Sequence, residues 1–281
     1  MFVQAHAKIN VFLDVLNKRD DGYHDLDMVM LPLELHDSIS VEVLNNVDST
    51  YVTCDHVELK NGKYNLINKT IAEMRKRYGF KQHFTIVVHK EIPISAGLGG
   101  GSSNAAAIIY ALNKLLKLKL SEEEQLDLAK SLGADVPFCL KNVPARVQGI
   151  GDIMKPIHLK QSYYVILLKP EQGLSTKTVF ELSDSMNMGH GDGDAVQKAL
   201  ETNDDELLSK SVFNSLELPS ISQIRTIQEY KDKLKQLGFK TVLMSGSGSC
   251  VFGLSHDKKL CKEAFKKLEK EGLEVYLTKT L

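Results

Sequence analysis

The N-terminal part of the chain carries the apolar–polar alternation of β-strands. Residues 2–16 are rich in β-branched and aromatic side chains, and residues 25–35 and 38–44 continue the pattern after a polar turn at residues 17–22. Together these segments predict an antiparallel meander. Apolar and polar side chains also alternate through residues 83–91, which predicts one more strand.

Three further segments carry the spacing of helices. Residues 65–78 place Leu, Ile and Met on one face and Lys and Arg on the other. Residues 103–117 repeat an apolar side chain every three or four positions. A third helix is predicted to begin after Ser121, because Glu124 completes a capping box, and to end near Gly133.

The pattern changes near Pro156, and we expect a domain boundary there, with domains at residues 1–155 and 156–281. Residues 184–194 are rich in Gly, Asp and Met and are predicted to form a mobile loop. Strands are then predicted at residues 163–169, 240–244, 250–254 and 273–278, and helices at residues 221–237 and 257–271.

The most informative stretch joins the strand at residues 83–91 to the helix at residues 103–117. It reads Pro-Ile-Ser-Ala-Gly-Leu-Gly-Gly-Gly-Ser-Ser, from Pro93 to Ser103. Glycine permits a positive φ and lets the backbone approach a ligand closely. A glycine-rich loop that leads into a helix presents unpaired N–H groups and the positive end of the helix dipole, so it suits a phosphate group.

Two common glycine loops do not fit this spelling. A Walker loop needs a lysine near its end, and no lysine lies between Glu91 and Ile109. A dinucleotide-binding fingerprint needs Gly or Ala three residues after Gly99, where Ser102 stands. A flexible linker or structural turn is the simpler alternative, but linkers are rarely followed at once by an alanine-rich amphipathic helix.

This loop resembles the phosphate loop of the GHMP kinases, the superfamily of galactokinase, homoserine kinase, mevalonate kinase and phosphomevalonate kinase. Segments at residues 5–13 and 243–253 resemble the same superfamily and stand in its order. The resemblance implies a two-domain α+β fold, with an N-terminal domain like ribosomal protein S5 and a ferredoxin-like C-terminal domain. It also implies ATP and Mg²⁺ as cofactors, although the sequence contains no evident pair of acidic metal ligands.

Within the superfamily, the chain resembles the branch of the non-mevalonate isoprenoid pathway, which phosphorylates the 2-hydroxyl of an erythritol alcohol that carries a cytidine diphosphate group. Residues 21–24 (Asp-Gly-Tyr-His) and 132–138 (Leu-Gly-Ala-Asp-Val-Pro-Phe) carry this resemblance. One departure is His6, where that branch usually has proline. The alternatives are a GHMP kinase for homoserine or mevalonate, and a non-catalytic nucleotide-binding protein of the same fold.

The resemblance implies an ATP site in two parts. Asn65 and Leu66 match the adenine pocket, although by spelling alone they mark only the start of a helix. Ser102 or Ser103 is expected to contact Mg²⁺ or a phosphate oxygen. The residues expected to cradle the triphosphate are Pro93, Ser95, Ala96, Gly97, Leu98, Gly99, Gly100, Gly101, Ser102 and Ser103.

The same resemblance implies that Lys8 and Asp135 act on the acceptor hydroxyl. Asp135 would take the proton of the attacking hydroxyl as general base, and Lys8 would pair with it and hold the developing negative charge. From the residues alone, a lysine on a strand is more often a solvated surface residue. The alternative for Asp135 is the N-cap of the short segment that follows it.

For the acceptor, the resemblance implies a cytosine pocket. Tyr23 would stack on the ring, His24 would hydrogen-bond its edge, and Phe180 would cover its second face. Without the resemblance, Tyr23 and His24 would be a surface aromatic and a solvated histidine. The other substrate-binding residues that it implies are Asn10, Thr176, Ser245, Gly246, Ser247 and Gly248.

Composition argues against several other classes of protein. The chain has 35 basic and 36 acidic side chains, so no global field recruits nucleic acid or an anionic membrane. No apolar run approaches the roughly 20 residues that span a bilayer, and the first residues lack the design of a signal peptide. Four scattered cysteines suit reduced thiols in the cytoplasm. We expect a cytoplasmic monomer or weak homodimer whose partner is a small molecule.

Overall fold

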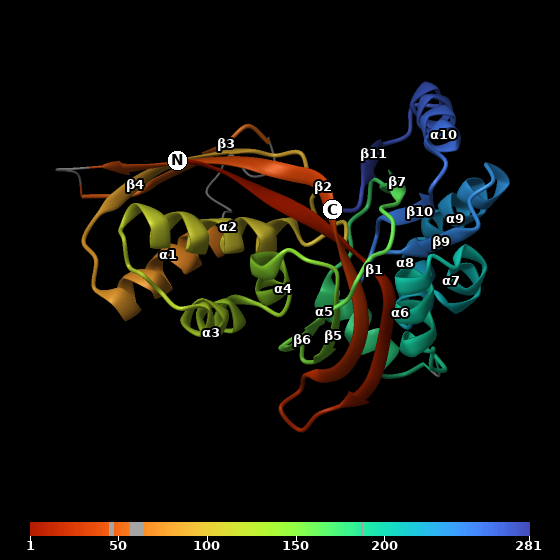
Figure 1. Cartoon of the computed structure of the whole chain (residues 1–281), viewed down its shortest axis with the longest axis horizontal. Helices are drawn as coiled ribbons and strands as arrows, with labels where there is room; N and C mark the ends of the chain where they lie inside the picture. Colours follow the sequence, from red (N-terminus) through yellow and green to blue (C-terminus); the bar gives the residue numbers. More distant parts are fainter. Residues whose placement is uncertain (45–47, 57–64, 187) are drawn as a thin grey trace. The chain divides into compact units, whose positions relative to one another are not determined.

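The computed structural model describes residues 1–44, 48–56, 65–186 and 188–281, and the chain falls into two compact units (Figure 1). The first unit comprises residues 1–7, 35–92 and 99–142. The second comprises residues 8–34, 93–98 and 143–281. The units therefore interleave along the sequence, and the expected domain boundary between residues 155 and 156 stays a prediction.

The first unit is a sheet with helices on one face (Figure 1). The end of β2 pairs antiparallel with β4, from Ser38 opposite His89 to Leu44 opposite His83, and β3 pairs parallel with β4. The strands that contribute to this unit are β1 (Phe2–Lys18), β2 (His24–Leu44), β3 (Tyr51–Cys54) and β4 (His83–His89), and its helices are α1 (Asn65–Tyr78), α2 (Gly100–Leu115), α3 (Glu122–Leu132) and α4 (Val136–Lys141).

A single apolar cluster holds the first unit together. Phe84, Ile86 and Val88 alternate along β4 and are fully buried, as the two-residue period requires. They meet the apolar faces of α1 and α2, where Met74 and Ile109 are also fully buried. Removal of this apolar surface from water is the main driving force for the helix–sheet packing.

The second unit contains a four-stranded antiparallel sheet in the order β11 (Val275–Lys279), β7 (Tyr164–Leu168), β10 (Val251–Ser255) and β9 (Thr241–Met244). Helices α9 (Thr226–Gln236) and α10 (Lys258–Lys270) pack against it. Residues 8–18 of β1 and 24–34 of β2 also belong to this unit. The remaining elements of the unit are β5 (Ala145–Gly149), β6 (Ile153–Pro156), α5 (Thr176–Ser183), α6 (Gly193–Thr202), α7 (Asp205–Ser211), β8 (Phe213–Asn214) and α8 (Glu217–Gln223).

Two predicted helices are confirmed in detail. Helix α1 has the predicted bounds. Helix α3 begins after Ser121 with both hydrogen bonds of the capping box, from Glu124 N to Ser121 Oγ and from Ser121 N to the Glu124 carboxylate. None of the helices in the described ranges is long and apolar enough to cross a membrane.

Two predicted boundaries are wrong. The strands expected at residues 25–35 and 38–44 form one strand, β2, in which Asp37, between the two predicted segments, is fully buried. The helix expected at residues 221–237 is two helices, because Ile224 adopts an extended backbone and turns its side chain into the core. In both places a buried tertiary contact overrides the local pattern.

Candidate active site

In the second unit, β1 places two polar side chains of the predicted site in the interior. Lys8 is 3% exposed and Asn10 is 1% exposed, and the Lys8 ammonium donates a hydrogen bond of 2.7 Å to Asn10 Oδ1. Residues two apart on a strand point to the same face. The alternative that Lys8 is a solvated surface lysine is therefore wrong. A buried ammonium that is held in place in this way is a candidate for stabilising negative charge.

The first part of the glycine-rich loop contacts Lys8 and a second glycine-rich turn, residues 245–249. The Lys8 N–H donates to Leu98 O at 3.0 Å, and the Ser245 hydroxyl donates to Gly97 O at 3.0 Å. Gly97 has φ of 73°, and a Cβ there would lie 2.0 Å from Ser245 O. Glycine is therefore required at residue 97 for two reasons, the left-handed backbone and the close approach of another chain segment.

Replacement of Gly97 by alanine is expected to destabilise the protein and to weaken ATP binding. The left-handed backbone alone costs a non-glycine residue about 1–3 kcal/mol, and the added methyl group forces the two glycine segments apart. Gly22→Ala is the matched control, since Gly22 has φ of 83° and nothing within 4 Å of its would-be Cβ. Thermal unfolding and the KM for ATP measure the difference. Equal effects of the two substitutions would contradict the packing argument.

Hydrogen bonds from the side chain of Asn214 hold the second glycine-rich turn in place. The Asn214 side-chain amide donates to Met244 O and to Gly246 O, each at 2.8 Å, and Asn214 is buried. A Cβ on Gly246 would lie 3.2 Å from the Lys8 ammonium. The turn thus brings its backbone close to the candidate catalytic lysine. Sequence analysis did not identify Asn214, because no local motif marks it.

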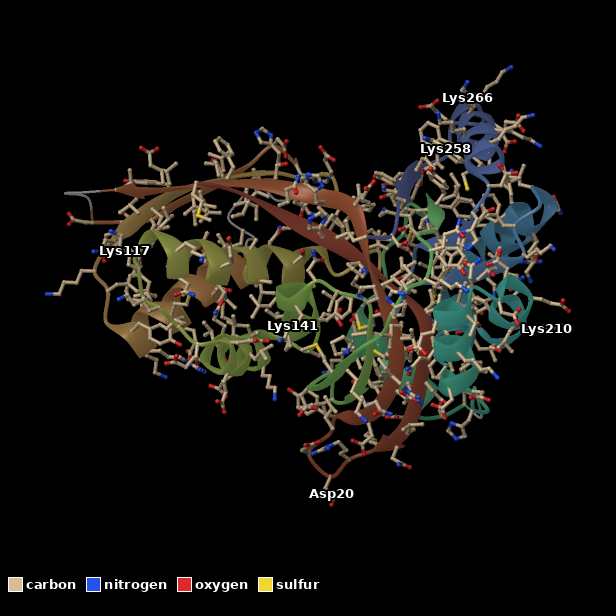
Figure 2. The ribbon with its side chains drawn as sticks, viewed as in Figure 1. Asp20, Lys117, Lys141, Lys210, Lys258 and Lys266 are labelled. Carbon is tan, nitrogen blue, oxygen red and sulfur yellow. The ribbon has the colours of Figure 1, made fainter. Side chains whose placement is uncertain are left out.

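Two of the residues expected around cytosine meet in the same unit. The ring of Phe180, on α5, lies 5.0 Å from the ring of His24, at the start of β2, with 31° between the planes. Thr176 at the start of α5 shares a hydrogen bond of 2.9 Å with Ser247 of the second glycine-rich turn. Tyr23 is 61% exposed. It follows the β1–β2 turn that Asp20 marks in Figure 2. An exposed ring there is available for stacking.

In the first unit, the rest of the glycine-rich loop opens α2. Gly99 is the N-cap, with φ of 71° and no side-chain cap, and the helix begins at Gly100, three residues earlier than predicted. The backbone N–H groups of such an uncapped terminus are available to an anion. The Ser103 hydroxyl donates to His6 O at 2.6 Å, whereas Ser102 is only half-buried. Of the two serines, Ser102 is the better placed to contact a ligand.

An orphaned polar atom lies in the first turn of the same helix. Asn104 is 4% exposed, and its Oδ1 has no hydrogen-bond partner. Buried polar atoms are usually satisfied by protein or by a bound molecule. The uncapped terminus and this unsatisfied oxygen both fit a site that is completed by a polar ligand such as a nucleotide.

A buried ion pair fixes the backbone between β4 and the glycine-rich loop. Lys90 donates to Asp37 Oδ2 at 2.7 Å, and Asp37 Oδ1 accepts the N–H groups of Glu91 and Ile92 at 2.9 and 2.8 Å. Burial lowers the pKa of the Lys90 ammonium, and Asp37 opposes that effect. A Cβ on Gly100 would lie 3.0 Å from the Lys90 ammonium. The pair therefore anchors the strand end beside the helix terminus.

Asp135 occupies the N-cap position of α4 but does not act as its cap. Its side chain makes no capping hydrogen bond to the helix, and the residue is half-buried. The helix-cap explanation for this carboxylate is therefore wrong. Leu66 lies in the first turn of α1 as expected, while the side chain of Asn65 lies outside the described part of the chain. The roles expected for Asp135, Asn65 and Leu66 stay predictions.

The described residues contain no group of three His, Cys, Asp or Glu side chains that could hold a metal ion. Mg²⁺ commonly keeps several waters and binds through one or two carboxylates together with the phosphates of a nucleotide. Ser102, half-buried in the first turn of α2, offers a hydroxyl oxygen that would suit such an ion.

Family models match both halves of the chain. Residues 65–142 match the GHMP kinases N terminal domain, and residues 196–274 match the GHMP kinases C terminal domain. A 4-diphosphocytidyl-2-C-methyl-D-erythritol kinase of Acetivibrio thermocellus is 35% identical over 280 residues, which cover 99% of this chain and 98% of the relative. A Streptococcus uberis protein that provisionally carries the same name is 40% identical over 278 residues, with the same coverage.

Solved structures give the same result. A 4-(cytidine 5'-diphospho)-2C-methyl-D-erythritol kinase superimposes with a TM-score of 0.82 and 29% identity, covering 100% of this chain and 99% of the other. Homoserine kinase from Cytophaga hutchinsonii superimposes with a TM-score of 0.73 at 18% identity, covering 100% and 94% of the two chains. The second similarity concerns the fold alone. The expected two-domain α+β fold of the GHMP kinases is confirmed.

Proposed function

We propose that this chain, which belongs to the 4-diphosphocytidyl-2-C-methyl-D-erythritol kinases of the GHMP kinase family, transfers the γ-phosphate of ATP to the 2-hydroxyl of 4-diphosphocytidyl-2-C-methyl-D-erythritol. The names of the relatives supply the acceptor alcohol. The observation that carries the proposal is the buried Lys8–Asn10 pair beside the second glycine-rich turn, in the same unit as His24 and Phe180.

The proposed reaction makes one bond and breaks one. The acceptor oxygen bonds to the γ-phosphorus of ATP, the bond from that phosphorus to the β–γ bridging oxygen breaks, and ADP leaves. The proton of the acceptor hydroxyl passes to the Asp135 carboxylate, the general base. In phosphoryl transfer, positioning and charge stabilisation supply most of the catalysis, so one base and a few fixed donors are sufficient.

Lys8 supports the reaction through its charge. As the hydroxyl loses its proton, negative charge grows on the acceptor oxygen, and a fixed ammonium in a buried site stabilises it more strongly than water does. The hydrogen bond to Asn10 holds that ammonium in place before the reaction begins. The hydrogen bonds of Asn214 to Met244 O and Gly246 O keep the second glycine-rich turn beside it.

The nucleotide is proposed to bind the start of α2. The N–H groups of Gly100, Gly101 and Ser102 hold the phosphate oxygens, and the Lys90–Asp37 pair fixes the chain beside this terminus. Mg²⁺ bound to ATP would neutralise charge on the β- and γ-phosphates. The cytoplasmic location and the monomer or weak homodimer remain predictions.

Replacement of Tyr23 by alanine is expected to raise the KM for the cytidine acceptor by roughly 5- to 150-fold, the range that a base–aromatic stack contributes, and to leave kcat nearly unchanged. Tyr51→Ala is the matched control, because Tyr51 is 55% exposed, close to the 61% of Tyr23, and lies on β3. Steady-state assays of both variants with the cytidine acceptor give the comparison. The same KM in both variants would remove the stacking role.

A further inference from the structure

We propose that Asp184 is a positioning residue that holds His24 in the tautomer able to recognise cytosine, and that it thereby sets the preference of the enzyme for cytosine over uracil. The inference deepens the proposed function and rests on it. It concerns four residues of one unit: Lys18, His24, Phe180 and Asp184.

The imidazole of His24 is fixed on two sides. Its Nε2 lies 2.6 Å from Asp184 Oδ1, although the two residues are 160 positions apart in the chain. The Phe180 ring packs beside it, at 5.0 Å between centroids. The His24 side chain is only 9% exposed. The ring therefore has a defined plane and a defined edge toward Asp184.

The partner of Nε2 determines where the ring carries its hydrogen. An ionised carboxylate can only accept hydrogen bonds. Hydrogen bonds from Lys18, and then from His24, hold the pKa of the Asp184 carboxyl below its usual value, so the group is ionised near neutral pH. Nε2 must therefore carry a hydrogen. In the neutral imidazole, Nδ1 then has a lone pair and can only accept.

No hydrogen bond within the described part of the chain occupies Nδ1 of His24. Cytosine presents a 4-amino donor at the position where uracil presents a carbonyl oxygen. A lone pair on Nδ1 accepts a hydrogen bond from the amino group and repels the carbonyl oxygen. A polar site built for one hydrogen-bond partner rejects an analogue that lacks it. By fixing the tautomer of His24, Asp184 would thus let the His24 ring distinguish cytosine from uracil.

Asp184 and the nearby residues 190–191 both contact β1. Asp184 itself bonds Lys18, on β1, through its second carboxylate oxygen. Further along, the buried carboxylate of Asp14 accepts the N–H of Gly191 at 3.1 Å and a bond from His190 Nδ1 at 3.1 Å. These contacts tie residues 184 and 190–191 to β1. A fixed carboxylate is what a positioning role requires.

The test compares the wild-type protein with Asp184→Asn, using 4-diphosphocytidyl-2-C-methyl-D-erythritol and its uridine counterpart as acceptors. An asparagine amide can accept from Nε2–H or donate to bare Nε2, so it allows both tautomers. We expect the ratio of kcat/KM for the cytidine acceptor over the uridine acceptor to fall roughly tenfold or more, about the worth of one hydrogen bond. The KM for the cytidine acceptor rises, and kcat stays within about twofold.

Two variants and an NMR spectrum distinguish a positioning role of Asp184 from a purely structural one. Asp184→Glu retains a carboxylate and is expected to restore most of the ratio. Asp192→Asn is the matched control on the same segment, because Asp192 caps α6 and asparagine caps equally well. The ¹⁵N spectrum of the His24 ring is expected to report the Nε2–H tautomer in the wild-type protein and a mixture in Asp184→Asn.

The possible failures are distinguishable. An unchanged acceptor ratio and an unchanged His24 spectrum in Asp184→Asn would overturn the role of Asp184 alone, with the kinase intact. Equal losses with both acceptors, without recovery in Asp184→Glu, would also overturn it and make Asp184 structural. A wild-type protein that does not use the cytidine acceptor would overturn the proposed function, and the inference with it.

Discussion

Replacement of Asp135 by asparagine is expected to lower kcat for the cytidine acceptor by roughly 10²- to 10⁴-fold, the range that general acid–base catalysis contributes. The amide cannot take the proton of the attacking hydroxyl. Asparagine has nearly the same size and shape as aspartate and is as good a residue at the N-cap position, so α4 should be retained. Steady-state ATP consumption gives kcat, and thermal unfolding checks the fold.

Asp127→Asn is the matched control for this experiment. Asp127 lies on α3 in the same unit, its side chain is 72% exposed, and it bonds only a surface arginine, Arg77, among the contacts described. Its kcat is expected to stay within about twofold of the wild type, because an exposed ion pair contributes little. If Asp135→Asn kept its rate, the general-base assignment would be lost, while kinase activity itself would stand.

Replacement of Lys8 by methionine is expected to lower kcat by roughly 10²- to 10³-fold, the usual effect of removing one preorganised group that stabilises transition-state charge. Methionine is apolar and of similar length, so it suits a position that is 3% exposed. The KM for ATP is expected to change much less than kcat, because the ammonium acts when charge develops on the acceptor oxygen. Rate measurements at saturating ATP and acceptor isolate this effect.

The exposed residue Lys81 provides the comparison for Lys8, as Lys81→Met should leave kcat unchanged. Thermal unfolding of both variants separates chemistry from folding. A Lys8→Met protein with normal kcat and a lowered unfolding temperature would show that the buried lysine is structural. That outcome would leave Asp135 as the only one of the two predicted catalytic residues with a role in the reaction.

Local signals predicted much of the fold. Helix α3 was predicted from its capping box, and α1 from one apolar face, because both features lie within a few residues of each other in sequence. The continuity of β2 could not be predicted in this way. It depends on Asp37, whose partners Lys90, Glu91 and Ile92 lie more than fifty positions further along the chain. A buried ion pair of that kind leaves no local pattern, and the polar residue resembles part of a turn.

The residues of the candidate site also differ in whether a local sequence motif marks them. Lys8, Asn10 and the two glycine-rich segments were found because each lies in a short contiguous motif. Asn214 and Asp184 were missed, since each acts on a segment distant in sequence and neither belongs to a motif. Residues 184–194 were predicted to be a mobile loop, of which residue 187 lies outside the described part of the chain. Within the described part, residues 184 and 190–191 contact β1, and α6 begins at Gly193.

The most direct test of the account is an ATP-consumption assay with 4-diphosphocytidyl-2-C-methyl-D-erythritol, run beside homoserine and mevalonate. We predict turnover with the cytidine acceptor alone. The relatives are named as kinases of this acceptor, and the rings of His24 and Phe180 lie together, with the exposed Tyr23 next to His24 in the chain. Turnover with homoserine or mevalonate instead would contradict the cytosine pocket. Binding of ATP without turnover of any of the three alcohols would contradict the proposed kinase reaction itself.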